Sequence, residues 1–155
     1  MIHGAMDSEE FPWAPLRHAR DEAFVVGRIS RAEPDKFARN LWQVYARVPH
    51  PLRVRVLGWG PAIEARLGPP PSWAECFPAG SLAPPGFLAT LHAMVPLGGE
   101  AVENWAAYYT ARLAYDEPHR LAIAQRARQC LLDELAEPAA LAKAWRELFA
   151  SLEDP

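Results

Sequence analysis

The chain has 155 residues, half of them apolar, which is enough for one domain with a hydrophobic core. Its formal net charge of −3 argues against a nucleic-acid-binding protein that relies on a basic surface. No apolar run approaches the ~18 residues of a membrane span, and the first residues lack the regions of a signal peptide, so we expect a cytoplasmic protein without a transmembrane segment.

The amino-terminal half predicts a strand, a helix and a second strand. After a loop-rich lead-in at residues 1–22, the apolar run from Ala23 to Arg28 predicts a buried strand of a parallel sheet. A helix is expected over residues 34–48, with apolar side chains on one face (Phe37, Leu41, Val44, Tyr45 and Val48). The alternation over residues 53–57 predicts a strand with one partly wet face, near the sheet edge.

Shorter elements follow in the middle of the chain. Proline fits the first position of a helix, so Pro61 predicts that a short helix covers residues 62–67. Apolar segments between prolines and glycines then predict a short strand near Cys76, a short helix at 86–91, a strand at 93–97 and a helix at 100–115.

Two amphipathic helices are expected at the carboxyl end, over residues 118–136 and after Pro138. Their apolar stripes are expected to pack in the core (Leu121, Ala124, Ala127, Leu131 and Leu135; then Leu141, Trp145, Leu148, Phe149 and Leu152). The order of elements therefore predicts an α/β fold: one Rossmann-like domain over residues 1–155, with a parallel sheet, flanking helices and a helical carboxyl terminus.

Two cations lie where such a sheet binds ligands. Arg28 closes the first predicted strand and Lys36 follows eight residues later, at the start of the next helix. Open parallel sheets bind ligands outside the carboxyl ends of their strands, and a guanidinium with an ammonium there suits phosphate oxygens. Gly27, Gly58 and Gly60 would let the backbone approach such a ligand. The alternative reading is two ordinary surface cations.

Several segments, in order, resemble the carboxyl-terminal half of retaining glycosyltransferases of family four, which have two Rossmann-like domains (the GT-B fold). These segments are His3-Gly4-Ala5-Met6-Asp7, Phe24-Val25-Val26-Gly27-Arg28-Ile29, Gly58-Trp59-Gly60-Pro61, His92 to Glu100, and Asp116-Glu117-Pro118-His119-Arg120. The resemblance covers most of the chain. It implies a donor-binding domain whose partner is a nucleotide sugar, with residues 1–22 leading in from an interdomain linker.

The resemblance also implies roles for individual residues. Arg28 and Lys36 would hold the donor diphosphate, the glycines Gly27, Gly58 and Gly60 would allow backbone approach, and Glu103 would bind the donor sugar or ribose. The sequence departs from the family in its paired-glutamate region and in its domain content. The second family glutamate would fall on Ala111, and a strand-helix-strand portion is missing after Trp105; the acceptor-binding domain is missing too.

No cofactor or metal is expected. Cys76 and Cys130 are far apart and are expected to be buried free thiols. The five histidines form no zinc-ligand spacing with them, and no Asp-x-Asp occurs. The sequence assigns no catalytic residue. It leaves three functions open. The first is one half of a metal-independent glycosyltransferase, which would work with a separate acceptor domain. The second is a non-catalytic remnant or self-associating interaction module on the same scaffold, and the third is a purely helical binding module.

Overall fold

The computed structural model describes residues 11–19, 21–97, 103–134, 142–143, 145–147 and 149–150. Contacts divide the chain into two compact units, residues 14–120 and residues 1–13 with 121–155. The first unit contains the sheet and the second contains most of the long carboxyl-terminal helix.

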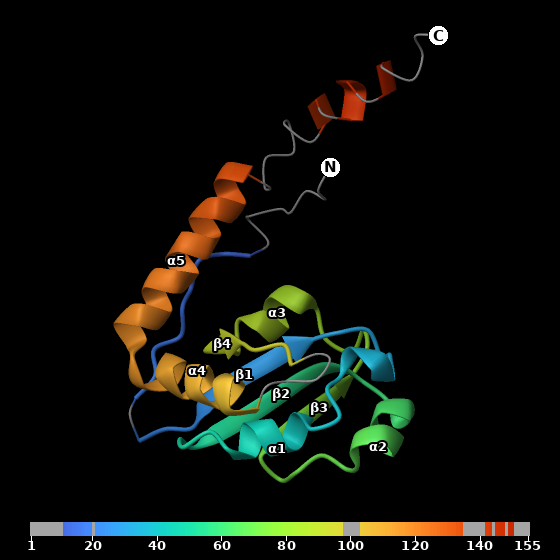
Figure 1. The fold of residues 1–155 in the computed structure, drawn as a ribbon. Helices are drawn as coiled ribbons and strands as arrows, with labels where there is room; N and C mark the ends of the chain where they lie inside the picture. Colours follow the sequence, from blue (N-terminus) through green and yellow to red (C-terminus); the bar gives the residue numbers. More distant parts are fainter. Residues whose placement is uncertain are drawn as a thin grey trace. The chain divides into compact units, whose positions relative to one another are not determined.

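A four-stranded parallel sheet forms the centre of the first unit (Figure 1). Its strands are β1 (Phe24–Ile29), β2 (Leu52–Trp59), β3 (Ala74–Pro78) and β4 (Ala93–Met94), in the spatial order β3-β2-β1-β4. The chain adds strands outward from β1 to β3 and then returns to the other side of β1, as in Rossmann-like sheets. The predicted α/β fold class is therefore confirmed.

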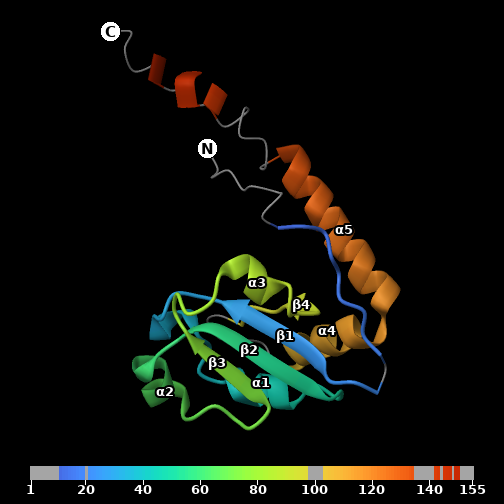
Figure 2. The same ribbon diagram turned by 180° about the vertical axis from the view of Figure 1, so that it is seen from behind.

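Helices cover both faces of this sheet (Figures 1 and 2). The helices α1 (Leu41–Ala46), α2 (Pro61–Leu67) and α4 (Glu103–Tyr115) contribute Leu41, Ile63 and Ala114 to one core cluster, while α3 (Pro84–Leu88) contributes Phe87 to a cluster on the opposite face. The larger cluster also contains the even-numbered apolar side chains of β1 and β2 (Phe24, Val26, Val54 and Val56), all of them fully buried. Burying each such side chain stabilises the fold by about 1.5–3 kcal/mol.

The strand predicted near the sheet edge lies inside the sheet. β2 pairs with β1 on one side and with β3 on the other. Its alternating Arg53 and Arg55 form the partly wet face that was predicted, with Arg53 exposed and Arg55 half-buried. Both contact Glu75 of β3: Oε1 lies 3.2 Å from Arg53 Nη1 and Oε2 lies 2.9 Å from Arg55 Nε. Polar residues on one face of β2 were therefore taken as a sign of an edge strand. In an interior strand, the same residues can form ion pairs with the neighbouring strand.

The single helix predicted over residues 34–48 is wrong in its middle. The chain forms a short 3-10 helix, η1 (Pro34–Lys36), becomes extended at Phe37 (φ −111°, ψ 129°), and resumes as α1 at Leu41. Arg28 accounts for the break, because its guanidinium takes the Lys36 carbonyl that a helix would have used for its own i to i+4 bond. The apolar face predicted for this region is nevertheless buried, from Phe37 to Val48.

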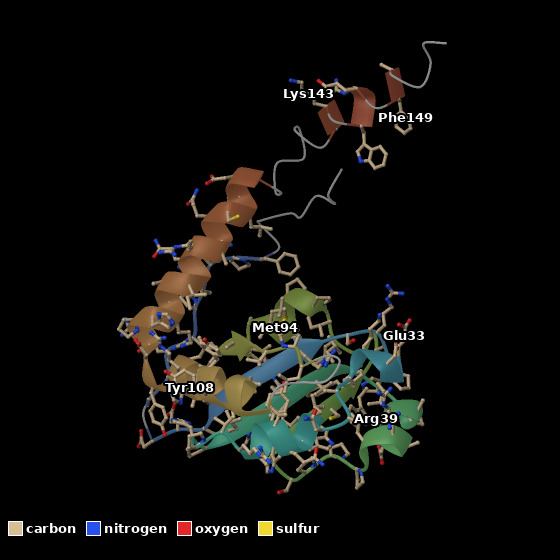
Figure 3. All side chains as sticks on the ribbon, in the orientation of Figure 1. Glu33, Arg39, Met94, Tyr108, Lys143 and Phe149 are labelled. Carbon is tan, nitrogen blue, oxygen red and sulfur yellow. The ribbon has the colours of Figure 1, made fainter. Side chains whose placement is uncertain are left out.

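Two later elements differ from the sequence-based expectation. The helix α3 begins at Pro84, two residues before the predicted start, and β4 covers only Ala93–Met94. Met94 is 55% exposed and Tyr108 of α4 is 60% exposed (both are labelled in Figure 3). The two-residue β4 therefore leaves an apolar side chain exposed at the edge of the sheet.

The carboxyl-terminal stripes do not pack in a core as expected. In α5 (Glu117–Glu134), Ala127 is exposed and Leu121, Ala124 and Leu131 are only partly buried, while Leu135 lies outside the described residues. Trp145 and Phe149 are 42% and 57% exposed, and Leu141, Leu148 and Leu152 also lie outside the described residues. Within the described part of the chain, no helix is long and apolar enough to cross a membrane.

Gly58 occupies a position in β2 that only glycine tolerates. Its φ is +103°, and an added Cβ would lie 1.8 Å from the Ser30 carbonyl oxygen. We expect Gly58→Ala to destabilise the protein by about 3 kcal/mol or more, because backbone strain and overpacking add together. Gly86→Ala is the matched control, because Gly86 lies in α3 with nothing within 4 Å of the added Cβ. Urea denaturation measures both, and a cost for Gly58→Ala no larger than for the control would contradict this packing.

Candidate functional site

The strand order identifies one crevice as the expected ligand site. The order reverses between β1 and β4, so the loops after these two strands diverge at their carboxyl ends. Arg28 stands at this point, one residue before the end of β1. Its side chain belongs to the same face as Phe24 and Val26, and only 4% of its surface is exposed.

The Arg28 guanidinium joins the two loops that border the crevice. Its Nη1 donates to the Leu97 carbonyl after β4 at 2.5 Å, and its Nη2 donates to the Lys36 carbonyl after β1 at 2.6 Å. The Phe37 ring covers it, with 4.2 Å between the guanidinium carbon and the ring centroid. The Nε atom has no acceptor among the described residues. Burial lowers the pKa of Arg28, which still carries its charge at neutral pH.

A neighbouring hydrogen bond fixes the same two segments. The Tyr45 hydroxyl of α1 donates to the Val95 carbonyl at 2.7 Å, and burial raises the pKa of Tyr45, so the hydroxyl remains protonated. The Ala38 amide also donates to the Leu97 carbonyl at 3.3 Å. The chain after β1 and the chain after β4 are therefore held together by three donors.

Lys36 contributes its backbone, and not its ammonium, to this arrangement. Its side chain is about half exposed, with Nζ 3.8 Å from Oδ2 of Asp35. The structure thus brings Arg28 to the Lys36 carbonyl, while the two cationic groups have different partners. Diphosphate binding by this pair stays a prediction, and Arg28 would take part in it through an N–H that its two carbonyls leave unused or by releasing one of them.

The three glycines have different surroundings. A Cβ on Gly27 would lie 2.5 Å from a methyl of Leu91, and a Cβ on Gly58 would collide with Ser30, so both allow close packing within the chain. Gly60 is open, because the nearest atom to an added Cβ is 3.7 Å away on Ala32. Gly60 also borders a pocket.

Glu103 is the first residue of α4, but its side chain lies outside the described part of the structure. The same holds for the predicted motif residues His3 to Asp7 and Gly98 to Glu100. Their predicted roles therefore stay predictions.

An open pocket of about 710 Å³ lies at the carboxyl ends of β2 and β3. Its lining includes Trp59, Gly60, Pro61, Glu64, Cys76 and Pro78. It adjoins the loop after β1, because Arg66 of α2 donates to the Pro34 carbonyl at 2.8 Å. Sequence reasoning noted Gly60 and Pro61 but missed Trp59, Glu64 and Cys76. Their positions in the sequence could have identified them, because they lie in or directly after two neighbouring parallel strands, near the carboxyl ends where such sheets bind ligands.

The pocket combines an apolar wall with one carboxylate. The Trp59 ring is held against Phe37 and Trp42, with ring centroids 6.0 Å and 5.6 Å away, and its Nε1 donates to Glu64 Oε2 at 3.4 Å. Glu64 is exposed, so its carboxylate can also accept hydrogen bonds from hydroxyl or amino groups of a ligand. Burial, with the nearby charge of Glu64, raises the pKa of the Cys76 thiol to about 12. Cys76 is therefore a weak nucleophile.

No group of His, Cys, Asp and Glu side chains that could hold a metal ion occurs within the described residues. Neither cysteine is buried as expected, because Cys76 is partly exposed and Cys130 is exposed.

The Arg28 bridge predicts a specific loss of stability. Arg28→Met should destabilise the protein by about 2 kcal/mol, because the Lys36 carbonyl loses a charged donor in a buried setting. Lys36→Met is the matched control and should change stability by less than about 0.5 kcal/mol, because its ammonium forms only a surface ion pair. Chemical denaturation of both variants measures the difference, and equal stabilities would show that the guanidinium does not hold the loops.

The two thiols should differ in reactivity. Cys130 is exposed, whereas the raised pKa of Cys76 leaves it almost wholly protonated at pH 8. We expect Cys76 to react with iodoacetamide more than about 100-fold more slowly than an ordinary exposed thiol. Mass spectrometry of peptides from a labelling time course measures this. The rate at Cys76 should rise in Glu64→Gln, and rapid labelling of Cys76 in the unmutated protein would contradict its assigned environment.

No family model matches the chain, and neither a curated protein nor a solved structure gives a significant match. The Rossmann-like class therefore follows from the parallel sheet and its strand order, and the site is described by its geometry alone.

Proposed function

We propose that this chain is the nucleotide-sugar-binding half of a metal-independent glycosyltransferase. The observation that carries the proposal is the pocket at the carboxyl ends of β2 and β3, since open parallel sheets bind ligands outside the carboxyl ends of their strands; the pocket lies one strand away from the reversal between β1 and β4. The ordered resemblance to family-four enzymes in the sequence supports the same assignment.

In this proposal the pocket receives the nucleoside part of the donor. The apolar wall of Trp59, Pro61 and Pro78 suits a planar base, and the exposed Glu64 carboxylate suits ribose hydroxyls or a base amino group. The diphosphate would extend toward the loop after β1, where Lys36 lies half exposed. Arg28 would join it by exchanging a carbonyl for a phosphate oxygen, a stronger acceptor because it is charged.

Cations beside the diphosphate would stabilise the negative charge that develops on the leaving group during glycosyl transfer. The chain carries no assigned catalytic residue, so a separate acceptor-binding domain would complete the reaction. A nucleotide-sugar donor and two free thiols fit the cytosol, which is the compartment we propose.

A second candidate is a non-catalytic interaction module on the same scaffold. Both terminal nitrogens of Arg28 are used by carbonyls and Lys36 is paired with Asp35, which is the arrangement of a structural bridge with a surface ion pair. This candidate predicts a stable fold that binds no nucleotide, with self-association as a further possible activity.

Thermal unfolding with nucleotide ligands distinguishes the two candidates. UDP, GDP and their sugar conjugates are added at 5 mM, and the proposal expects at least one of them to raise the melting temperature by about 5 °C when it is ~100-fold above its Kd. Ala65→Phe should abolish the shift by filling the pocket from the exposed surface of α2 without changing the core. Lys36→Met should reduce it, because the diphosphate loses a cation.

Gln43→Phe on α1 provides the matched control, because it adds the same ring at an exposed site outside the pocket lining. No shift with any of these ligands would exclude the donor-binding proposal and favour the interaction module. A shift that persists unchanged in Ala65→Phe would move the binding site away from this pocket.

A further inference from the structure

Three histidines gather around Phe24 at the amino end of β1, opposite the end where the pocket lies. The His18 ring lies 5.1 Å from both the His50 and His92 rings between centroids, and 5.0 Å from the Phe24 ring. Phe24 stacks on His92 at 5.1 Å with an interplanar angle of 16°. These residues come from the lead-in, from β1, from the turn before β2 and from the residue before β4.

His92 is held in one neutral form by its hydrogen bonds. The Val25 amide donates to Nδ1 of His92 at 2.9 Å, so Nδ1 must be unprotonated. The other nitrogen, Nε2, lies 3.1 Å from the Arg17 carbonyl, which can only accept, so Nε2 carries the proton. The imidazole thus replaces the strand carbonyl that would otherwise accept from Val25, while the His92 amide donates to the Val25 carbonyl at 2.9 Å.

His50 forms one hydrogen bond within the cluster. Its Nδ1 lies 2.9 Å from the Pro51 carbonyl, which can only accept, so Nδ1 is the donor. Its Nε2 is buried without a partner among the described residues, and only 7% of the residue is exposed.

The same cluster fastens the lead-in to the sheet. His18 packs on Phe24, Arg17 accepts from His92, and the Leu16 carbonyl accepts from Arg120 Nη1 at 3.2 Å. Arg120 is buried and brings a permanent positive charge to within 5.6 Å of the Phe24 ring centroid. A proton added to His92 would therefore enter a site that already holds this guanidinium, which adds to burial in lowering the pKa of His92.

We infer that residues 16–18 and the histidine cluster form a proton-operated latch: protonation of His92 releases the lead-in from the amino end of β1. The proton binds Nδ1 and removes the acceptor of the Val25 amide. The two N–H groups, of Val25 and of protonated Nδ1, then face each other, and the resulting cation lies near His18 and Arg120. The ring must turn away, and its Nε2 thereby leaves the Arg17 carbonyl. This latch does not depend on the proposed function.

The charged and titratable groups around His92 determine the direction of the effect. They are His18, Arg17 and Glu22 of the lead-in, His50 before β2, Tyr115 of α4, and Glu117 and Arg120 at the start of α5. Glu117 is engaged by Arg120, with 3.2 Å between Oε1 and Nη2. Desolvation is the largest influence, and it lowers the pKa of His92 below its ordinary value near 6.5.

A lowered pKa in the folded state means that the unfolded chain binds the proton more readily. The stabilisation from neutral His92 is therefore complete above about pH 6.5 and is lost as the pH falls through that value toward the lower folded pKa. The latch is closed at neutral pH and opens in mildly acidic solution.

Nuclear magnetic resonance of the full chain between pH 7.5 and 4.5 tests this inference. At neutral pH we expect NOEs between the ring protons of His18 and Phe24, and a protected Val25 amide. As His92 titrates, the NOEs should disappear and the Val25 amide should exchange at least about 10-fold faster, after correction for the intrinsic pH dependence of exchange. Both changes should have the midpoint of the His92 ring titration.

His92→Asn is the non-titrating variant, because asparagine also carries an acceptor bonded to Cγ and can receive the Val25 amide. Its NOEs and exchange should not change with pH, whereas His119→Asn, at a histidine outside the cluster, should behave like the unmutated protein. If His92→Asn does not fold, the titration of the unmutated protein decides. NOEs and Val25 protection that persist after His92 is protonated would overturn the latch.

Discussion

A single guanidinium determines how this sheet ends. Arg28 points inward from β1, and because a buried charge must be paired, it takes the carbonyls of Lys36 and Leu97 from the two loops that leave the sheet at its topological reversal. The break of the helix after Lys36, the inward turn of Phe37 and the close approach of the loop after β4 all follow from this requirement. The expected ligand crevice is thereby tied together at its centre.

The pocket described above lies beside the neighbouring pair of strands, β2 and β3. Arg28 is engaged, and this open pocket at the carboxyl edge is where Trp59 and Glu64 present an apolar wall and an acceptor. The amino edge is organised on the same principle, since the His92 ring also replaces a backbone partner. Arg28 and His92 differ in one respect. Arginine keeps its charge at any accessible pH, whereas His92 stops accepting the Val25 amide when its Nδ1 gains a proton.

Local patterns predicted most elements of the sheet. The apolar run that ends at Gly27 and Arg28 became β1, and Pro61 marked the start of α2, because a buried parallel strand and a first helical turn have strong local signatures. The pairing of Arg53 and Arg55 with Glu75 lies between different strands, so the same pattern could not tell an interior strand from an edge. Apolar stripes at the carboxyl end likewise indicated amphipathic helices but not burial.

By itself, then, the sequence determined the fold class, the order of strands and helices along the chain, and the presence of Arg28 at the end of β1 and of Lys36 in the segment that follows it. Only the tertiary structure decided what Arg28 binds, which strands border the pocket and which histidines meet around Phe24. The physical reason is the range of the forces involved. Backbone preferences and hydrophobic periodicity act within a few residues, whereas the acceptors of a buried charge are carbonyls brought from distant parts of the chain.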